Sequence, residues 1–311
     1  MHMALPKNKL SIIPTYNTRP PQQPILRRKR IQIVIVSIFL LGILIYILKL
    51  VTGGSNGLGS GNPPVVIVTV FDYEKYNKNY IEGIKQNRIN YAKKHGYATF
   101  FANSTDYELN GAPNSWAQVP AIRHAISKYD QCKYAWYLSH NSVIMNPAIS
   151  VDGDIMSPAV LERKMLVNQP LVPPSSVIKT FQNLKGENIE FVLTQDQTGL
   201  VLGSYIFRRG SWSKFFLDVW FDPLYRSYNF QKAHIHALEH IVQWHPTILS
   251  KLALIPQRML NSYSKPDTTS EAGVYREGDF VVELTGCEQT DRNCATEVQP
   301  YLERSKLMIQ R

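Results

Sequence analysis

Runs of apolar residues separated by polar or glycine-containing stretches predict strands that alternate with helices. The β-branched run at residues 65–71 is typical of a strand buried on both faces. Residues 76–95 follow with a helical pattern that Gly96 ends, because Tyr80, Ile84, Asn87 and Tyr91 recur near helical spacing. Strand and helix in this order indicate the first half of a parallel-sheet unit.

The same alternation continues along the chain and predicts an α/β fold. After residue 96 we expect strands at 98–101, 135–138, 191–194 and 280–284, and helices at 116–129, 214–220 and 232–243. Ser115 is a candidate cap for the helix that begins at Trp116. The proline- and serine-rich segment 148–186 predicts a loop region outside the core. The pattern therefore predicts a mostly parallel, Rossmann-type sheet with flanking crossover helices.

One hydrophobic segment is too long and uniform for a strand. Residues 31–48 form an uncharged 18-residue stretch, which is enough to cross a hydrocarbon core of about 30 Å. A basic cluster precedes this stretch, so the positive-inside rule predicts a cytosolic N-terminus and a lumenal remainder. We expect a cytosolic basic tail at 1–30, a single transmembrane helix at 31–51, a flexible stalk at 52–63 and a lumenal domain at 64–311. A cleaved signal peptide is the alternative.

The net charge of +10 is concentrated in that tail. Seven of the ten excess positive charges lie in residues 1–30, which leaves three for the other 281 residues. Nucleic-acid binding by the folded part is therefore not expected, because it needs a basic surface. The three cysteines form no zinc-binding pattern. In an oxidising lumen Cys287 and Cys294 could form a disulfide that closes a short loop, and Cys132 is then a buried free thiol.

A polar cluster interrupts the apolar run near residue 138. Ser139, His140, Asn141 and Ser142 separate the apolar residues 135–138 from 143–145. This position is where a buried strand leaves the carboxyl edge of a sheet, and open α/β sheets bind ligands at that edge. The cluster is therefore a candidate binding site, although it lacks the carboxylates that such an edge often carries.

Six segments in order resemble glycosyltransferase family 34, whose members include fungal galactosyl- and mannosyltransferases and plant xyloglucan xylosyltransferases. The segments are SWAQVPAIRHAI (115–126), YAWYLSHNSVIMNP (134–147), LTQDQTGLVLGSYIFRRGSWSKFFLDVWFDP (193–223), ALEHIVQWHPTIL (237–249), IPQRMLNSY (255–263) and YREGDFVVELTGC (275–287). The resemblance implies a GT-A-like fold, a nucleotide-sugar donor and transfer with retention of anomeric configuration.

The resemblance also implies a metal site, from which this chain departs. In the family, two aspartates of an Asp-x-Asp motif hold Mn²⁺ or Mg²⁺ against the donor diphosphate. Here Ser139 and Asn141 occupy those positions with His140 between them, and Glu283 stands where the family often has a histidine. Because neutral oxygens bind hard cations less tightly than carboxylates do, this metal site is expected to be altered. Catalysis with a different metal arrangement, catalysis without metal and a noncatalytic role all remain open.

The resemblance assigns further site residues. Asp196 and Gln195 are the candidate catalytic residues, since Asp196 follows a predicted strand at the place where the family holds the sugar. Candidate substrate-binding residues are Gln197, Gly203, Ser204, Arg123 and Trp116. For Arg123 the alternative is a surface salt bridge, and for Gly203 it is a packing role.

The expected function follows from the resemblance, which is greatest to the α-1,6-mannosyltransferase subunits of the yeast Golgi mannan polymerase complex. It implies a Golgi type II α-mannosyltransferase that uses GDP-mannose, with a mannan or N-glycan acceptor and other Golgi glycosyltransferase subunits as partners. One alternative is an α-galactosyltransferase that uses UDP-galactose. The other is a noncatalytic structural subunit with a degenerate glycosyltransferase fold.

Overall fold

The structure is a computed structural model that describes residues 62–172, 176–228, 230–266 and 271–310. The chain divides into two units, residues 1–56 and 57–311. The predicted basic tail, transmembrane helix and most of the stalk lie outside the described residues. Among the residues that are described, no helix combines the length and the apolar character needed to cross a membrane.

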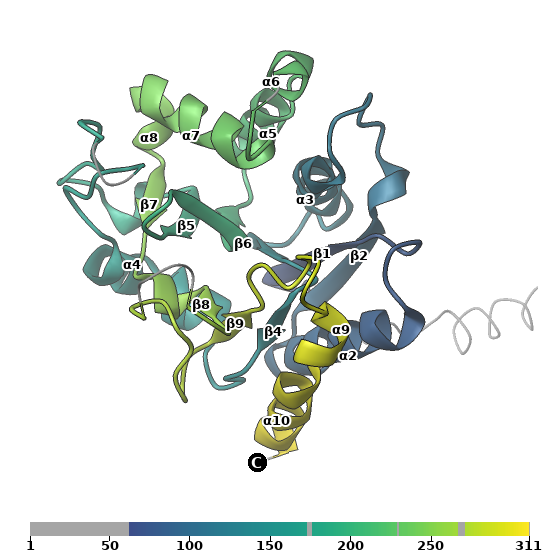
Figure 1. The fold of residues 1–311 in the computed structure, drawn as a ribbon. Coiled ribbons are helices and arrows are strands. Elements are labelled where there is room, and N and C mark those ends of the chain that lie inside the picture. The colour runs from purple at the N-terminus through teal and green to yellow at the C-terminus, as the bar shows by residue number, and fades with distance from the viewer. Residues whose placement is uncertain (1–61, 173–175, 229, 267–270, 311) are drawn as a thin grey trace, which may run out of the picture. The chain divides into compact units, whose positions relative to one another are not determined.

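A six-stranded sheet forms the centre of the second unit (Figure 1). Its strands lie in the order β2, β1, β3, β6, β5, β7, and only β6 is antiparallel to its neighbours. Their bounds are β1 Val65–Phe71, β2 Ala98–Asn103, β3 Tyr134–Leu138, β5 Phe191–Gln195, β6 Leu200–Arg208 and β7 Leu252–Leu254. The prediction of a mostly parallel sheet is confirmed, but the sequence pattern did not separate the antiparallel strand β6 from the residues before it.

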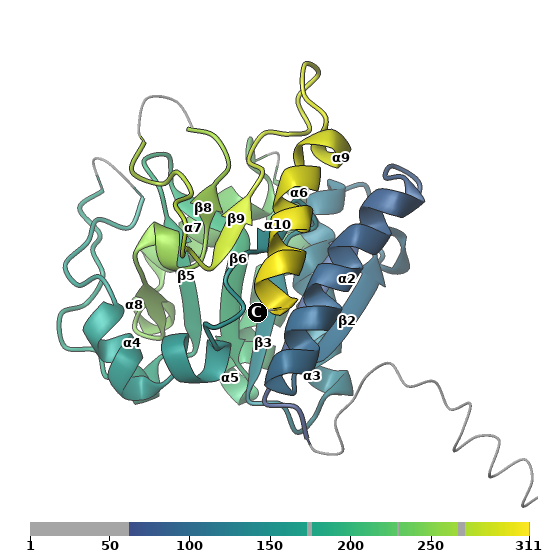
Figure 2. The ribbon, with the colours of Figure 1, turned by 90° about the horizontal axis from the view of Figure 1, so that it is seen from below.

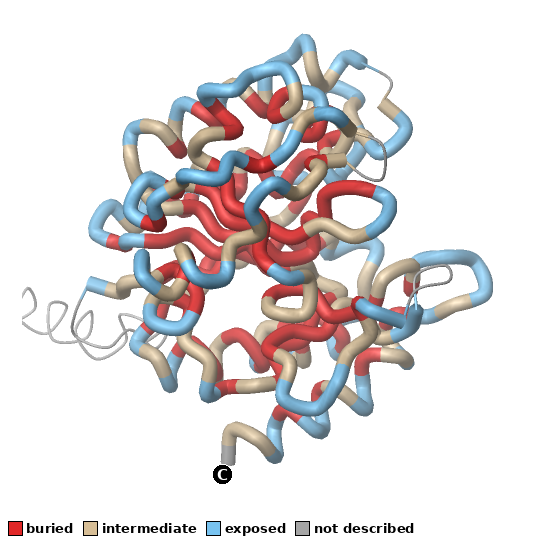
Figure 3. Tube along the Cα trace, turned by 90° about the vertical axis from the view of Figure 1, so that its left-hand side faces the viewer, coloured by how far each residue is buried: buried red, intermediate tan, exposed pale blue. Residues whose placement is uncertain are grey.

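Helices cover both faces of this sheet. Strand β1 sends Val66 and Val68 to one face and Val65 and Ile67 to the other, as period-two alternation requires. The first face packs against α3 (Gln118–Lys128), α5 (Ser211–Trp220) and α7 (His234–Trp244). The second packs against α2 (Lys78–His95). Figure 3 shows the strands as the most continuously buried part of the chain.

A small second sheet lies beside α2. It contains β4 (Ser142–Ile144), β9 (Val281–Glu283) and β8 (Ser262–Tyr263), in that order. Helix α10 (Gln299–Gln310) runs alongside α2 and completes this layer (Figure 2). The remaining helices are short: α4 Pro158–Lys164, α6 Pro223–Ser227, α8 Pro246–Leu249 and α9 Cys294–Glu297.

Most predicted elements are confirmed with small shifts at their ends. Helix α2 begins after Asn77, whose side chain accepts a hydrogen bond from the backbone N–H of Tyr80, and ends at Gly96, which has φ +68°. The prediction for Ser115 was wrong. A 3₁₀ turn at Asn114–Ala117 precedes α3, and the Ser115 hydroxyl contacts His234 instead of capping the helix.

The cysteine prediction is confirmed. Cys287 and Cys294 form a disulfide with a Cα–Cα distance of 4.9 Å, and Cys132 is buried and free. The disulfide joins the segment after β9 to the first residue of α9.

A chain of polar side chains runs through the core between α3 and α7. The Tyr205 hydroxyl donates to Gln118 Oε1 at 2.8 Å, and the Gln118 amide contacts His234 Nε2. His234 Nδ1 lies 3.1 Å from the Ser115 hydroxyl. Burial lowers the pKa of His234 from 6.5 to about 3, because the charged imidazole would lose its hydration. His234 therefore stays neutral while the protein is folded.

His234 is expected to make folding sensitive to acid. Between pH 6.5 and about 3 the unfolded chain protonates this imidazole and the folded chain does not, so stability falls as the pH falls. The slope from one such group is at most about 1.4 kcal/mol per pH unit. We predict that His234→Gln flattens the fall in unfolding free energy between pH 7 and 4.5, measured by urea denaturation. The matched control, His245→Gln at an exposed position, should keep the wild-type slope; an unchanged slope in His234→Gln would contradict the assignment.

Candidate functional site

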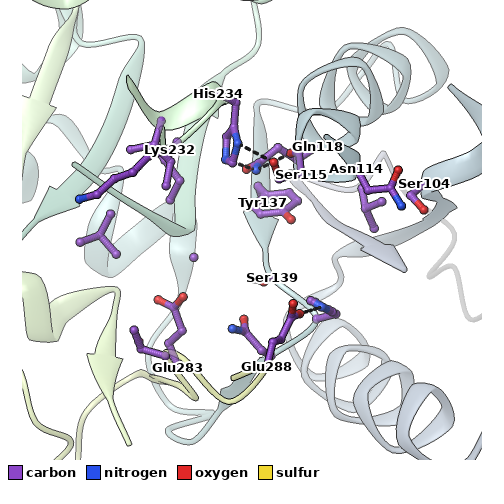
Figure 4. Close-up of a pocket in the computed structure, with 18 of the residues that line it drawn as sticks. Ser104, Asn114, Ser115, Gln118, Tyr137, Ser139, Lys232, His234, Glu283 and Glu288 are labelled. Atoms are coloured by element: carbon purple, nitrogen blue, oxygen red, sulfur yellow. Dashed lines mark hydrogen bonds and ion pairs between the residues drawn. The ribbon is translucent and has the colours of Figure 1, made fainter. Parts of the chain in front are cut away.

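A cavity of about 480 Å³ opens at the edge of the main sheet where β1 and β3 end. Figure 4 shows His234 and Lys232 on one side of it and Glu283 and Glu288 on the other. The polar side chains that line it are Asp72, Lys75, Tyr76, Ser104, Asn114, Ser115, Gln118, Tyr137, Ser139, His140, Asn141, Asp196, Thr198, Lys232, His234, Tyr263, Glu283, Thr285 and Glu288. The polar cluster identified in the sequence therefore faces a cavity at the expected edge.

The segment 139–141 is held from behind by a buried arginine. Arg88, on α2, is completely buried, and one of its terminal nitrogens donates to the carbonyl oxygens of Ser139 at 2.8 Å and Ser142 at 2.7 Å. Within the described part of the chain Arg88 forms no ion pair with a carboxylate. Burial lowers its pKa to about 9, because the guanidinium is removed from water. A cation thus lies directly behind the segment that lacks carboxylates.

His140 is turned toward the rim of the cavity. Its Nε2 lies 2.8 Å from the Tyr76 hydroxyl and 3.2 Å from Glu288, which also pairs with Lys75. Burial lowers the pKa of His140 below its usual value, so the ring is neutral near pH 7. As a predicted metal ligand, His140 has one ring nitrogen already engaged by Tyr76 and Glu288.

Glu283 reaches the same edge from β9. It lies opposite Ser142 in the register of β4 and β9, and the next backbone N–H, that of Leu284, donates to the Asn141 carbonyl at 2.9 Å. Its carboxylate lies against the Cα of Gly203, where an added Cβ would be only 2.0 Å from Oε2. An added Cβ would force the Glu283 carboxylate to move, so the structure shows Gly203 in the packing role that was the alternative to close approach of a ligand.

Asp196 lies in the turn between β5 and β6 and lines the cavity. Its Oδ1 accepts hydrogen bonds from the Thr198 backbone N–H at 2.6 Å, the Thr198 hydroxyl at 2.9 Å and the Gly199 N–H at 3.1 Å. Its Oδ2 accepts from the Tyr263 hydroxyl at 2.7 Å. Four donors therefore fix this carboxylate in one orientation.

The other predicted site residues lie outside the cavity lining. Trp116 is buried in the core, and the Ser204 hydroxyl, also buried, accepts from Trp136. Arg123 pairs with Asp218 on the surface, which is the alternative weighed from the sequence. Two glutamines flank Asp196 without lining the cavity: Gln195 donates to the Pro170 carbonyl, and Gln197 is exposed.

The structure adds lining residues that sequence reasoning missed. Lys232 donates to the Thr198 hydroxyl at 3.2 Å, which places its ammonium group near the Asp196 turn. His234 and Gln118 line the cavity from the buried polar chain between α3 and α7. Glu288 directly follows a disulfide cysteine. The sequence offers only one signal for these residues, the polar composition of their segments. Their positions at the cavity depend on contacts between distant parts of the chain.

The residues at the altered motif fit a divalent cation that a substrate helps to hold. Among the described residues, no group of three or more His, Cys, Asp or Glu side chains could hold a metal by itself. However, Asn141 Oδ1 is buried and accepts no hydrogen bond from the described residues, and Glu283 supplies a carboxylate next to this segment. Magnesium is commonly bound through one or two carboxylates together with substrate phosphates. Asn141 and Glu283 match that kind of incomplete site.

Comparison with known proteins assigns the chain to a family. Residues 61–295 match the model of the galactosyl transferase GMA12/MNN10 family. An uncharacterized alpha-1,2-galactosyltransferase of Schizosaccharomyces pombe is 30% identical over 73% of this chain and 69% of its own length. A probable alpha-1,6-mannosyltransferase of Saccharomyces cerevisiae is 28% identical over 78% of this chain and 62% of its own length. Against two further Schizosaccharomyces pombe relatives the match spans only 60% of their lengths.

A solved structure shares the fold. A glycosyltransferase involved in the glycosylation of the major capsid of PBCV-1 superposes with a TM-score of 0.50 and 12% identity, over 80% of this chain and all of that one. The likeness supports the expected GT-A-like arrangement of a mixed sheet with flanking helices. With the family model matching most of the chain, the protein belongs to glycosyltransferase family 34, the galactosyl transferase GMA12/MNN10 family.

Proposed function

We propose that this glycosyltransferase transfers mannose from GDP-mannose to a mannan or N-glycan acceptor. The linkage formed would be α, specifically α-1,6, and the anomeric configuration would be retained. It would act as a Golgi type II membrane protein anchored by residues 31–51, together with other glycosyltransferase subunits. Support for mannose comes from a relative that carries the name of a probable alpha-1,6-mannosyltransferase. Support for the anchor comes from the uncharged stretch at 31–48 behind a basic cluster.

The observation that carries the proposal is the meeting of three distant segments around one cavity. Residues 139–141 connect β3 to β4, Asp196 lies in the turn after β5, and Glu283 ends β9 of the small sheet. All of them line the cavity. A nucleotide sugar has a diphosphate and a sugar ring that must be held at the same time. Such a cavity, at the carboxyl edge of an α/β sheet, is suited to both parts.

Different residues would act on the sugar and on the diphosphate of the donor. Asp196 is fixed by its four donors and would stabilise the positive charge that develops on the sugar ring as its bond to phosphate breaks. Lys232 lies next to the Asp196 turn and would attract the diphosphate. Bound Mn²⁺ or Mg²⁺, held by Asn141 and Glu283, would supply neutralisation of the diphosphate charge.

Two alternatives each have an observation in their favour. An α-galactosyltransferase that uses UDP-galactose is favoured by relatives named as alpha-1,2-galactosyltransferases. A noncatalytic subunit is favoured by the neutral Ser139 and Asn141 at the metal-binding motif. Assays of the purified full chain with GDP-mannose and with UDP-galactose distinguish mannose transfer from the first alternative. Absence of transfer from either donor, with intact folding and co-purifying subunits, would support the second.

Asp196→Asn tests the role of the carboxylate. The amide keeps an oxygen for the turn but removes the charge, so we expect transfer to fall roughly 100-fold or more with little change in thermal stability. The matched control is Asp222→Asn, because Asp222 accepts a similar turn hydrogen bond from the Leu224 N–H and does not line the cavity. Equal activity of the two variants would refute a catalytic role for Asp196.

The incomplete metal site predicts opposite effects of two changes. Glu283→Gln should raise the Mn²⁺ concentration for half-maximal transfer roughly tenfold or more, because it removes the carboxylate beside Asn141. Ser139→Asp combined with Asn141→Asp should lower that concentration. Both are measured by titrating Mn²⁺ into the metal-stripped full chain during donor turnover. Transfer that is unaffected by chelation, in wild type and both variants, would exclude this site.

A further inference from the structure

The exposed face of helix α7 carries a line of aromatic rings. His236, His240 and Trp244 are spaced four residues apart, so they lie on one face of the helix and succeed one another at about 6 Å. His240 and Trp244 are exposed, Trp244 to 71%, and their ring centroids are 6.3 Å apart. We call these three residues the α7 stripe. Exposed apolar side chains that cluster with other rings often mark a binding surface, whereas isolated ones do not.

The α7 stripe begins at the cavity. Lys232, which lines the cavity, donates its backbone N–H to His236 Nδ1 at 3.3 Å. His234 and Ile235, at the start of α7, line the cavity as well. From His236 the stripe leads away from this end of the helix to Trp244, over about 12 Å. The start of α7 therefore borders the cavity, and His236 is the first residue of the stripe beyond that border.

Two further rings lie beside the middle of the stripe. Tyr225, on α6, and Phe230 place their ring centroids 6.2 and 6.4 Å from that of His240. The other face of α7 is core, since Ala237, Leu238, Ile241 and Val242 are buried. Aromatic side chains therefore surround His240, the middle residue of the stripe.

We propose that the α7 stripe is a binding subsite for the acceptor oligosaccharide, which holds sugar units distant from the one that is glycosylated. The proposal rests on the proposed function, because it assumes a glycan acceptor in the cavity. A hexose has an apolar C–H face that packs on an aromatic ring, and hydroxyls that pair with imidazole nitrogens. Side chains placed one helical turn apart along α7 suit successive units of such a chain, whereas a protein partner would more usually meet a compact patch around a buried anchor.

Trp244→Ala in the full chain tests the subsite. The probes are linear α-1,6-linked mannohexaose, which reaches beyond the cavity, and methyl α-mannoside, which does not. We expect KM for mannohexaose to rise roughly tenfold and KM for methyl α-mannoside and for the donor to stay the same. Trp244→Phe should restore most of the affinity, because it keeps an aromatic face. Phe215→Ala is the matched control, since Phe215 is 58% exposed on α5 and lies outside the stripe.

The outcomes separate this proposal from the proposed function. A mannohexaose KM that is the same in Trp244→Ala, Phe215→Ala and wild type would overturn the subsite. Loss of a co-purifying protein from Trp244→Ala with an unchanged mannohexaose KM would overturn it too, in favour of a protein-docking face. If the wild type transfers nothing, the proposed function fails. The subsite is then decided by calorimetric binding of mannohexaose without donor, which must weaken in Trp244→Ala and not in Phe215→Ala.

Discussion

The arrangement of the cavity depends on the buried guanidinium of Arg88. By donating to the carbonyls of Ser139 and Ser142, it ties α2 to the end of β3 and the start of β4, where the main sheet passes into the small one. A buried charge is costly unless hydrogen bonds satisfy it, and here two bonds go to the segment that faces the cavity and a third goes to Asn87 on α2. Burying Arg88 has a desolvation cost, and the buried guanidinium fixes the position of residues 139–141.

Charge is distributed unusually around this segment. Four carboxylates line the cavity, those of Asp72, Asp196, Glu283 and Glu288, against the ammonium groups of Lys75 and Lys232. Lys75 is already paired with Glu288 at 2.7 Å. An anionic diphosphate would meet net repulsion there unless a cation accompanied it, and Arg88 behind the segment offsets only part of the repulsion. The loss of two carboxylates at 139 and 141 thus does not make the cavity electropositive.

Local sequence patterns were sufficient for much of the fold. The β-branched run of β1, the helical spacing of α2 and the segment around 135–138 each reflect burial, which apolar periodicity records directly. Strand β6 was missed because it follows β5 after a short turn and the two strands were not read as separate elements. Its antiparallel direction follows from that short turn, because adjacent parallel strands need a long crossover connection. The helix cap assigned to Ser115 failed because a 3₁₀ turn at 114–117 delays the start of α3 to Gln118, and the Ser115 hydroxyl contacts His234.

The part of the site that lies in family motifs could be predicted from the sequence. Residues 139–141, Asp196, Gly203 and Glu283 were identified through resemblance, and the structure brings them to one cavity. Trp116 and Arg123 were selected from a matching segment, but side-chain direction decided that one is buried and the other pairs at the surface. Lys232, His234 and Glu288 escaped notice because their approach to the cavity results from tertiary packing.

The contact between Gly203 and Glu283 couples substitutions at these two positions. Because the carboxylate occupies the space that any β-carbon at 203 would need, the effect of a substitution at one position depends on the residue at the other. A side chain at 203 would require the Glu283 carboxylate, the end of a flexible side chain, to turn away from its present position beside Asn141. Substitutions at 203 and 283 are therefore expected to have non-additive effects when they are combined.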